Sequence, residues 1–253
     1  MAVPGTSLAV QEHVPVHVFV RQTSNSNGKP RPDWFSYEKC FKNLLSILDE
    51  NAKLTVIFDG DTEGHFISKY PSVNLINIKE GTETKSFTWL VNHVVERDIK
   101  DDDIVYFVED DYVHRPGSLD MIRDIFKYSN ADYASLYDHA DKYIPGYYQH
   151  FAQGFITHVV STDKSHWRTT PSTTNTYAMK FSTLKRDIDI HLKFSVFEKV
   201  GKISQDHQKF CELWNSGKSL VTPIPGYSTH CEIGLMSPHV DWVKVLDETT
   251  DNV

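Results

Sequence analysis

The sequence predicts an α/β fold in which helices flank a mostly parallel central sheet. Between residues 14 and 111, short apolar runs alternate with segments whose apolar residues recur at helical spacing, an order typical of parallel strands joined by helices. The run Ile-Val-Tyr-Phe-Val at 104–108 is apolar throughout, as expected of a strand buried on both faces. A chain of 253 residues, 40% of them hydrophobic, can bury a large core in one domain.

The elements of the first half can be assigned in order along the chain. We expect strands at 14–20, 54–59, 73–78 and 104–108. Between them, residues 33–50 form a predicted helix with Asp33 as its N-cap, and residues 85–98 form a second predicted helix. Ligands of such sheets bind beyond the carboxyl ends of the strands. The carboxylates that follow two of these strands, Asp59 and residues 109–111, therefore mark the expected site.

The second half has a mixed pattern. A Pro116–Gly117 turn precedes a predicted helix at 119–128 and a predicted strand at 133–137. Residues 166–170 and 175–181 alternate like antiparallel strands, and helical patterns follow at 184–192 and 205–215. We therefore expect one domain at 14–246, with halves 14–111 and 112–246, between tails at 1–13 and 247–253.

Composition excludes several classes of protein. The net charge of −8 argues against nonspecific binding to nucleic acid, because phosphate backbones attract basic stripes that the sequence lacks. No apolar run approaches the ~18 residues of a membrane span, and the first residues lack the pattern of a signal peptide. The three cysteines are odd in number and far apart in sequence, so no disulfide framework is expected. These features predict a cytoplasmic protein.

The acidic triplet at 109–111, Glu109-Asp110-Asp111, poses an electrostatic problem. Three adjacent carboxylates repel one another unless something positive compensates them. A second run, Asp101-Asp102-Asp103, precedes the same strand and suits a solvated loop. Mg²⁺ and Mn²⁺ favour carboxylate oxygens and commonly hold phosphates. The acidic triplet therefore predicts a metal site that helps to bind an anionic ligand.

The acidic triplet resembles the DxD motif, in its Glu-Asp-Asp form, of GT-A fold glycosyltransferases, which use nucleotide-sugar donors. The resemblance is closest to bacterial and viral family 2-like enzymes and extends from about Val14 to Trp242. Three segments carry it: residues 109–112, residues 166–174 and Ser228-Thr229-His230. It implies a GT-A (Rossmann-like) sheet in which the first half binds the nucleotide-sugar and the second half forms an acceptor-side subdomain.

The resemblance also implies roles for the acidic triplet. Asp111 would coordinate a Mn²⁺ or Mg²⁺ ion that bridges the diphosphate of the donor, Asp110 would reach the donor ribose or metal-bound waters, and Glu109 would orient the group. Such an ion offsets the charge of the leaving diphosphate. His230 would complete the metal shell, with His239 as the second choice.

Asp206 falls where inverting relatives have their catalytic base. Such a base takes the proton of the acceptor hydroxyl as that oxygen attacks the anomeric carbon. The alternative is structural, because Ser204 suits an N-cap and an Asp in the first turn favours the helix dipole. No covalent nucleophile stands out, which favours inversion.

Further residues are expected to contact the two substrates. The donor nucleotide would lie at the ends of the first two strands and at a helix start. These candidates are Arg21, Gln22, Thr23, Asp59, Lys85 and Ser86. The acceptor glycan would lie against aromatic and polar residues of the second half. These candidates are Asp138, His139, Tyr143, His166, Trp167 and Arg168. For Trp167, a place in the buried core is the alternative. The expected reaction is sugar transfer from a nucleotide diphosphate donor, with UDP favoured, to a glycan hydroxyl.

Other functions stay open at this point. Residues 56–62 resemble the Asp-x-Asp strand of haloacid-dehalogenase-type phosphatases through Asp59 and Asp61, although Glu63 departs from that family's pattern. A nucleotidylyltransferase would need a glycine-rich loop after the first strand, where residues 22–28 contain a single glycine. A non-catalytic sugar-binding module would use the aromatic residues without a base or a metal site.

Overall fold

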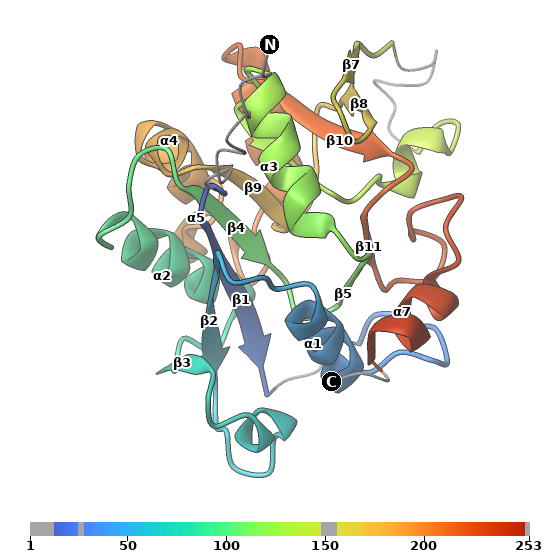
Figure 1. Cartoon of the computed structure of the whole chain (residues 1–253). Helices are drawn as coiled ribbons and strands as arrows, with labels where there is room; N and C mark the ends of the chain where they lie inside the picture. The colour runs from blue at the N-terminus through green and yellow to red at the C-terminus, as the bar shows by residue number, and fades with distance from the viewer. Residues whose placement is uncertain (1–12, 25–27, 148–155, 251–253) are drawn as a thin grey trace, which may run out of the picture.

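The computed structural model describes residues 13–24, 28–147 and 156–250. Within these ranges the chain forms a nine-stranded sheet of order β3-β2-β1-β4-β9-β6-β10-β8-β7 and a separate sheet of β11 and β5 (Figure 1). In the larger sheet, β8 and β9 run opposite to the other strands. The predicted α/β class with a mostly parallel central sheet is confirmed.

The parallel strands form one half of the larger sheet. They are β1 (Val16–Thr23), β2 (Ala52–Asp59), β3 (Asn74–Ile78) and β4 (Ile104–Val108), close to the predicted ranges. Because β1 lies between β2 and β4, its last residues stand beside both acidic strand ends. Thr23 pairs with Asp59, and Val20 pairs with Val108. The carboxyl ends of these strands thus meet at one edge of the sheet.

The helices that join these strands are α1 (Tyr37–Ser46) and α2 (Glu83–Val95), and α1 begins at another cap than predicted. Ser36, not Asp33, caps α1, because its hydroxyl accepts a hydrogen bond from the Lys39 N–H at 3.1 Å. Thr82 caps α2 in the same way, accepting from the Lys85 N–H at 3.3 Å. A capping side chain reaches an N–H two or three residues ahead. Asp33 lies too far upstream of α1 to do so.

The second half adds shorter strands and more helices. The strands are β5 (Tyr112–His114), β6 (Tyr133–Ala134), β7 (Val159–Ser161), β8 (His166–Thr169), β9 (Tyr177–Lys180), β10 (Leu220–Ile224) and β11 (Ser228–His230). The α-helices are α3 (Ser118–Tyr128), α4 (Phe181–Lys193), α5 (Phe197–Val200), α6 (Asp206–Asn215) and α7 (Trp242–Thr250). Among the described residues, 3₁₀ turns lie at Phe66–Lys69 and Ala140–Tyr143.

Strand pairing in the second half differs from the order along the chain. The segments 166–170 and 175–181 do form strands, β8 and β9, but these do not pair with each other. β9 lies between β4 and β6, and β8 lies between β10 and β7. Alternation of side chains specifies a strand with one buried face but not its partner. The predicted strand at 133–137 shortens to Tyr133–Ala134.

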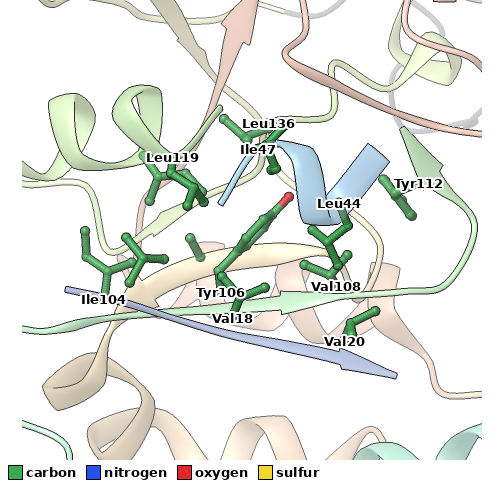
Figure 2. Close-up of a cluster of buried hydrophobic side chains, with 14 of the residues drawn as sticks. Val18, Val20, Leu44, Ile47, Ile104, Tyr106, Val108, Tyr112, Leu119 and Leu136 are labelled. Atoms are coloured by element: carbon green, nitrogen blue, oxygen red, sulfur yellow. The ribbon is translucent and has the colours of Figure 1, made fainter. Parts of the chain in front are cut away.

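Helices cover both faces of the larger sheet. On one face, α1 and α3 pack against β1 and β4, and Figure 2 shows their buried side chains together: Val18, Val20, Leu44, Ile47, Ile104, Tyr106, Val108 and Leu119. On the other face, α2, α4 and α6 bury a second cluster that includes Phe87, Leu90, Val94, Leu184, Phe210 and Leu213. In the part of the chain described, no helix is long and apolar enough to cross a membrane.

The small β5–β11 sheet is fixed to α1 and α7 by one buried amide. Asn43 donates to the His114 carbonyl at 2.8 Å, accepts from the His114 N–H at 2.6 Å and donates to the Thr249 hydroxyl at 2.8 Å. The free thiols of Cys40 and Cys231 lie 4.0 Å apart in the same region. Because α7 runs to Thr250, part of the predicted tail at 247–253 is helical; residues 251–253 and 1–12 lie outside the described ranges.

Replacement of Asn43 by alanine should destabilise the protein strongly. Asn43→Ala leaves the buried N–H and carbonyl of His114 without their partners, so the free energy of unfolding should fall by about 2–4 kcal/mol. Urea denaturation followed by circular dichroism measures this loss. The exposed Asn92 of α2 provides the matched control, and Asn92→Ala should change stability by less than about 0.5 kcal/mol. Equal effects of the two substitutions would contradict the anchoring role of Asn43.

Candidate active site

The acidic triplet lies directly after β4, and neighbouring strands hold its first member in place. The Glu109 N–H donates to the Thr176 hydroxyl at 3.0 Å, and that hydroxyl also lies 3.3 Å from Glu109 Oε2. From β1, Arg21 Nη2 approaches Glu109 Oε1 at 3.5 Å. Burial, followed by repulsion from Asp111 and Glu109, raises the pKa of Asp110 well above its ordinary value. The pKa of Asp110 is thus raised, whereas the pKa of its neighbour Asp111 is lowered.

Asp111 and His230 face each other across the β5–β11 sheet. Their strands bring them together because Tyr112 pairs with His230 and the Cys231 N–H donates to the Asp111 carbonyl at 2.9 Å. Asp111 Oδ2 lies 2.9 Å from His230 Nε2. Burial alone would raise the pKa of Asp111, but His230 and the nearby Lys29 hold it well below its ordinary value. Asp111 is therefore an ionised carboxylate, and the structure brings it to His230 rather than to His239.

Two basic residues that the sequence analysis did not identify complete this group. Arg31 Nη2 lies 2.6 Å from Asp111 Oδ2, and Lys29 Nζ lies 3.2 Å from His230 Nε2. Both belong to the segment that follows β1. The signal was present as two basic residues on either side of Pro30, just after a predicted ligand-binding strand end. The positive charge that the acidic triplet requires is thus supplied in part by the chain itself.

The donor atoms of Asp111 and His230 suit a divalent cation. Two ligands at right angles on a Mg²⁺-sized ion, with bonds of about 2.1 Å, lie about 3.0 Å apart, close to the observed 2.9 Å. Asp111 Oδ1 is buried and has no hydrogen-bond partner among the described residues. Within the same residues no group of three or more His, Cys, Asp and Glu side chains gathers around one point. Further ligands would come from phosphate oxygens and water, as is usual for Mg²⁺.

Asp206 is the first residue of α6 and is half-buried. Its Oδ1 accepts from the His207 N–H at 2.7 Å, while Ser204 does not act as the N-cap that the sequence suggested. The Ser204 hydroxyl instead contacts Glu83 Oε2 at 2.7 Å. Burial raises the pKa of Asp206, and Lys209 and Lys29 partly oppose this shift. A carboxylate with a raised pKa is a better general base near neutral pH.

A buried polar network lies beneath Asp206. Lys209 is fully buried, its ammonium donates to Asn175 Oδ1, and burial lowers its pKa to about 7. Asn175 Nδ2 in turn reaches Ser204 Oγ at 2.6 Å and Glu83 Oε1 at 3.2 Å. Glu83 also pairs with Arg21 at 3.0 Å. Sequence reasoning missed Glu83, Asn175 and Lys209; a lysine three residues after the candidate base, on the apolar face of its helix, was the available signal.

The other donor-side candidates are placed differently. Asp59 accepts from the Glu80 N–H at 2.8 Å and from the Gly81 N–H at 3.0 Å, so both of its oxygens are bonded to backbone groups. Gln22 is buried, and neither its amide oxygen nor its nitrogen has a partner among the described residues. Thr23 ends β1 beside Asp59.

The two α2 candidates have different environments. Ser86 is buried in α2. Lys85 lines a cavity of about 460 Å³ between α2 and α5, where its ammonium lies 4.7 Å from the Phe197 ring. Glu80, whose N–H donates to Asp59, lines the same cavity, whereas residues 109–111 do not line it.

The acceptor-side candidates form one tight cluster and leave two residues outside it. Arg168 Nη2 lies 2.7 Å from Asp138 Oδ1, and both side chains are buried. The Tyr143 hydroxyl donates to Asp138 Oδ2 at 2.8 Å. His166 is exposed near the edge of the sheet, and Trp167 is fully buried in the core. Trp167 therefore has the core position that was its alternative interpretation.

His139 lies beside this cluster in the chain, and Tyr137 lies between its ring and that of His230. Its ring packs against Tyr137 at 4.5 Å between centroids, and Tyr137 in turn lies 6.3 Å from the His230 ring. Its Nδ1 lies 2.9 Å from Asp141 Oδ1. Aromatic packing thus links the acceptor-side cluster to His230.

Comparison with known proteins gives distant similarities in structure alone. No protein family and no curated protein sequence matches the chain. A CMP-2-keto-3-deoxy-manno-octonic acid synthetase in complex with CTP is similar at 14% identity, with a TM-score of 0.48, over 94% of this chain and 98% of that one. TarS of S. aureus is similar at 14% identity and TM-score 0.47, over 85% of this chain and 59% of that one. Glycosyltransferase GlyE of Streptococcus pneumoniae is similar at 11% identity and TM-score 0.40, over 82% and 44%.

The buried Asp138–Arg168 pair should show strong energetic coupling. Asp138→Ala strands the buried guanidinium and should lower the free energy of unfolding by about 3–5 kcal/mol, and the double variant Asp138→Ala/Arg168→Met should recover part of that loss. A double-mutant cycle in urea measures the coupling. The exposed pair Asp102–Lys180 is the control, where Asp102→Ala should cost less than about 1 kcal/mol. Additive losses at positions 138 and 168 would contradict the coupling.

Proposed function

We propose that this protein is a glycosyltransferase that moves a sugar from a nucleotide diphosphate donor, with UDP favoured, to a hydroxyl group of a glycan. The observation that carries the proposal is the Asp111–His230 pair at the end of β4. A half-buried Asp206 with a raised pKa supports it, because Arg21 and Glu83 connect Glu109 with Ser204 at the entry to α6. Lys29 lowers the pKa of both Asp111 and Asp206, which supports assigning the two carboxyl groups to one site.

Each part of the site has a role in the proposed reaction. The acceptor hydroxyl oxygen attacks the anomeric carbon of the donor, and its proton passes to an oxygen of Asp206. The bond from the anomeric carbon to the diphosphate breaks with its electron pair, so the nucleoside diphosphate leaves from the opposite face. Asp111 and His230 would hold a Mn²⁺ or Mg²⁺ ion, which would offset the negative charge of the leaving group. A single base is sufficient for inversion.

Binding of the two substrates follows from the polar groups near these residues. The buried Gln22 side chain near the end of β1 has an N–H group and an amide oxygen without hydrogen-bond partners among the described residues. A nucleobase or a ribose could form hydrogen bonds with both groups. On the other side, the Tyr143 ring is 51% exposed and is held in place by the buried Asp138 and Arg168, and an exposed aromatic face suits the C–H surface of a sugar. We assign these two groups to donor and acceptor respectively.

Nucleotide-sugars should stabilise the protein in a metal-dependent way. With Mn²⁺ present and a UDP-sugar at about 100 times its Kd, binding should add about 2.7 kcal/mol of stability and raise Tm by about 5–10 °C. A thermal-shift series with UDP-, GDP- and dTDP-sugars, with and without Mn²⁺, measures the effect. Asp111→Asn should lose the Mn²⁺-dependent part of the shift while its circular dichroism spectrum is unchanged.

Two outcomes of this series would contradict the proposal. If no nucleotide raises Tm under any condition, the chain has no donor site. If nucleotides fail and the protein instead releases phosphate from phosphomonoesters in a reaction lost in Asp59→Asn, the phosphatase alternative holds. Sugar binding without transfer or hydrolysis of any donor would support a sugar-binding module.

Asp206→Asn should separate catalysis from donor binding. The amide cannot accept the acceptor's proton as a carboxylate does, so kcat should fall by about 10²–10⁴-fold, while the thermal shift with donor stays unchanged. The exposed Asp189 of α4 is the matched control, and Asp189→Asn should leave kcat unchanged. A normal kcat in Asp206→Asn would show that Asp206 is not the base and that its role is to stabilise the first turn of α6.

A further inference from the structure

The side chains of Arg31 and Lys29 contact the two atoms, Asp111 Oδ2 and His230 Nε2, that are the candidate ligands of a divalent cation. Arg31 Nη2 contacts Asp111 Oδ2 at 2.6 Å, and Lys29 Nζ contacts His230 Nε2 at 3.2 Å. Asp111 Oδ2 and His230 Nε2 are themselves 2.9 Å apart. An ammonium group, a guanidinium group and a candidate metal position therefore coincide around one pair of ligand atoms.

The two contacts of His230 Nε2 make opposite demands on this atom. The Lys29 ammonium only donates hydrogen bonds and requires a lone pair on Nε2, whereas the Asp111 carboxylate only accepts and requires a ring hydrogen there. One nitrogen cannot meet both demands at once. A divalent cation takes a lone pair from Nε2 and another from Asp111 Oδ2, so its binding would remove this conflict once Lys29 has moved away.

Arg31 and Lys29 differ in the exposure of their side chains, which are 13% and 39% exposed. Arg31 also donates to the Cys231 carbonyl at 2.7 Å and lies over the Phe35 ring at 4.7 Å. The side chain of Lys29 is 39% exposed, and its contact with Glu232 is a longer one, at 3.8 Å. Lys29 can therefore leave His230 at a lower cost than Arg31 can leave Asp111, because solvent and a flexible stem accommodate an exposed ammonium.

We propose that Lys29 and Arg31 are built-in counter-ions that compete with a divalent cation for Asp111 and His230. The inference rests on the proposed function: the phosphates of a nucleoside diphosphate give both side chains new partners and so free the ligand atoms. Cation and nucleoside diphosphate then bind cooperatively, and by linkage each raises the affinity of the other by the same factor.

Direct measurement of Mn²⁺ binding tests the competition without any assay of activity. The signal of free Mn²⁺ in electron paramagnetic resonance gives its Kd for the full chain, with and without UDP. In the wild-type protein, UDP should tighten Mn²⁺ binding by about 5–150-fold, the usual range of coupling between sites. Lys29→Gln should tighten Mn²⁺ binding in the absence of UDP by about 10-fold, because one competitor is gone, and should reduce the coupling.

Two control variants make the measurement specific. Lys69→Gln removes another partly exposed lysine, which pairs with Glu38, and should leave the Kd for Mn²⁺ unchanged. Asp111→Ala should abolish the binding. The conservative variant Arg31→Lys keeps the charge but loses the fork geometry, so it should resemble the wild type more closely than Arg31→Gln does. Circular dichroism establishes that each variant is folded.

The outcomes distinguish this inference from the proposed function. Equal Kd values for Mn²⁺ in the wild type and Lys29→Gln, or Mn²⁺ binding that survives Asp111→Ala, would overturn the competition. If UDP and the other nucleotides fail to bind while Lys29→Gln still tightens Mn²⁺ binding, the competition holds and the proposed donor is wrong. If nucleotides bind but Mn²⁺ binds to no variant, the donor site holds and the competition is wrong.

Discussion

The structure depends on one constraint, the need to neutralise three adjacent carboxyl groups at the end of a buried strand. Removing a carboxylate from water costs several kcal/mol unless a partner compensates it. Positive charge reaches residues 109–111 from Arg21 of the neighbouring strand and from Lys29 and Arg31 of the segment after β1, while His230 of the β5–β11 sheet contacts Asp111 directly. The position of the small sheet and the course of that segment are therefore coupled to the acidic triplet.

The same electrostatics connects the acidic triplet to the candidate base. Arg21 bridges Glu109 and Glu83, and Glu83 holds Ser204 at the entry to α6. Lys209 then lies beneath the first turn of that helix and partly opposes the raised pKa of Asp206. Because the members of the network are mutually paired, a change of charge at one place alters the field at the others. The two candidate carboxyl groups nevertheless have pKa values shifted in opposite directions, because burial dominates at Asp206 whereas His230 and the neighbouring cations dominate at Asp111.

Sequence alone predicted what depends on local pattern. Periodicity predicted the parallel strands and their helices. The position of the acidic triplet after a buried strand indicated a candidate site, and the resemblance to GT-A enzymes added His230; their roles stay predictions. Contacts between distant segments could not be predicted in this way: Lys29 meets His230 across 201 residues of chain, and Arg31 meets Asp111 across 80. For the same reason, alternation identified the strand of Trp167 but not its neighbours, which bury that ring in the core.

Charge complementarity also explains why a donor and a cation suit this site better together than separately. Without ligands, Lys29 and Arg31 already compensate much of the charge of residues 109–111. A divalent cation alone would bring additional positive charge to the side chains it displaces, and a diphosphate alone would bring negative charge to the acidic triplet. Both ligands together add little net charge, so neither repulsion is incurred in full. Because of Lys29 and Arg31, the site should therefore bind the cation and the diphosphate together more favourably than either one alone.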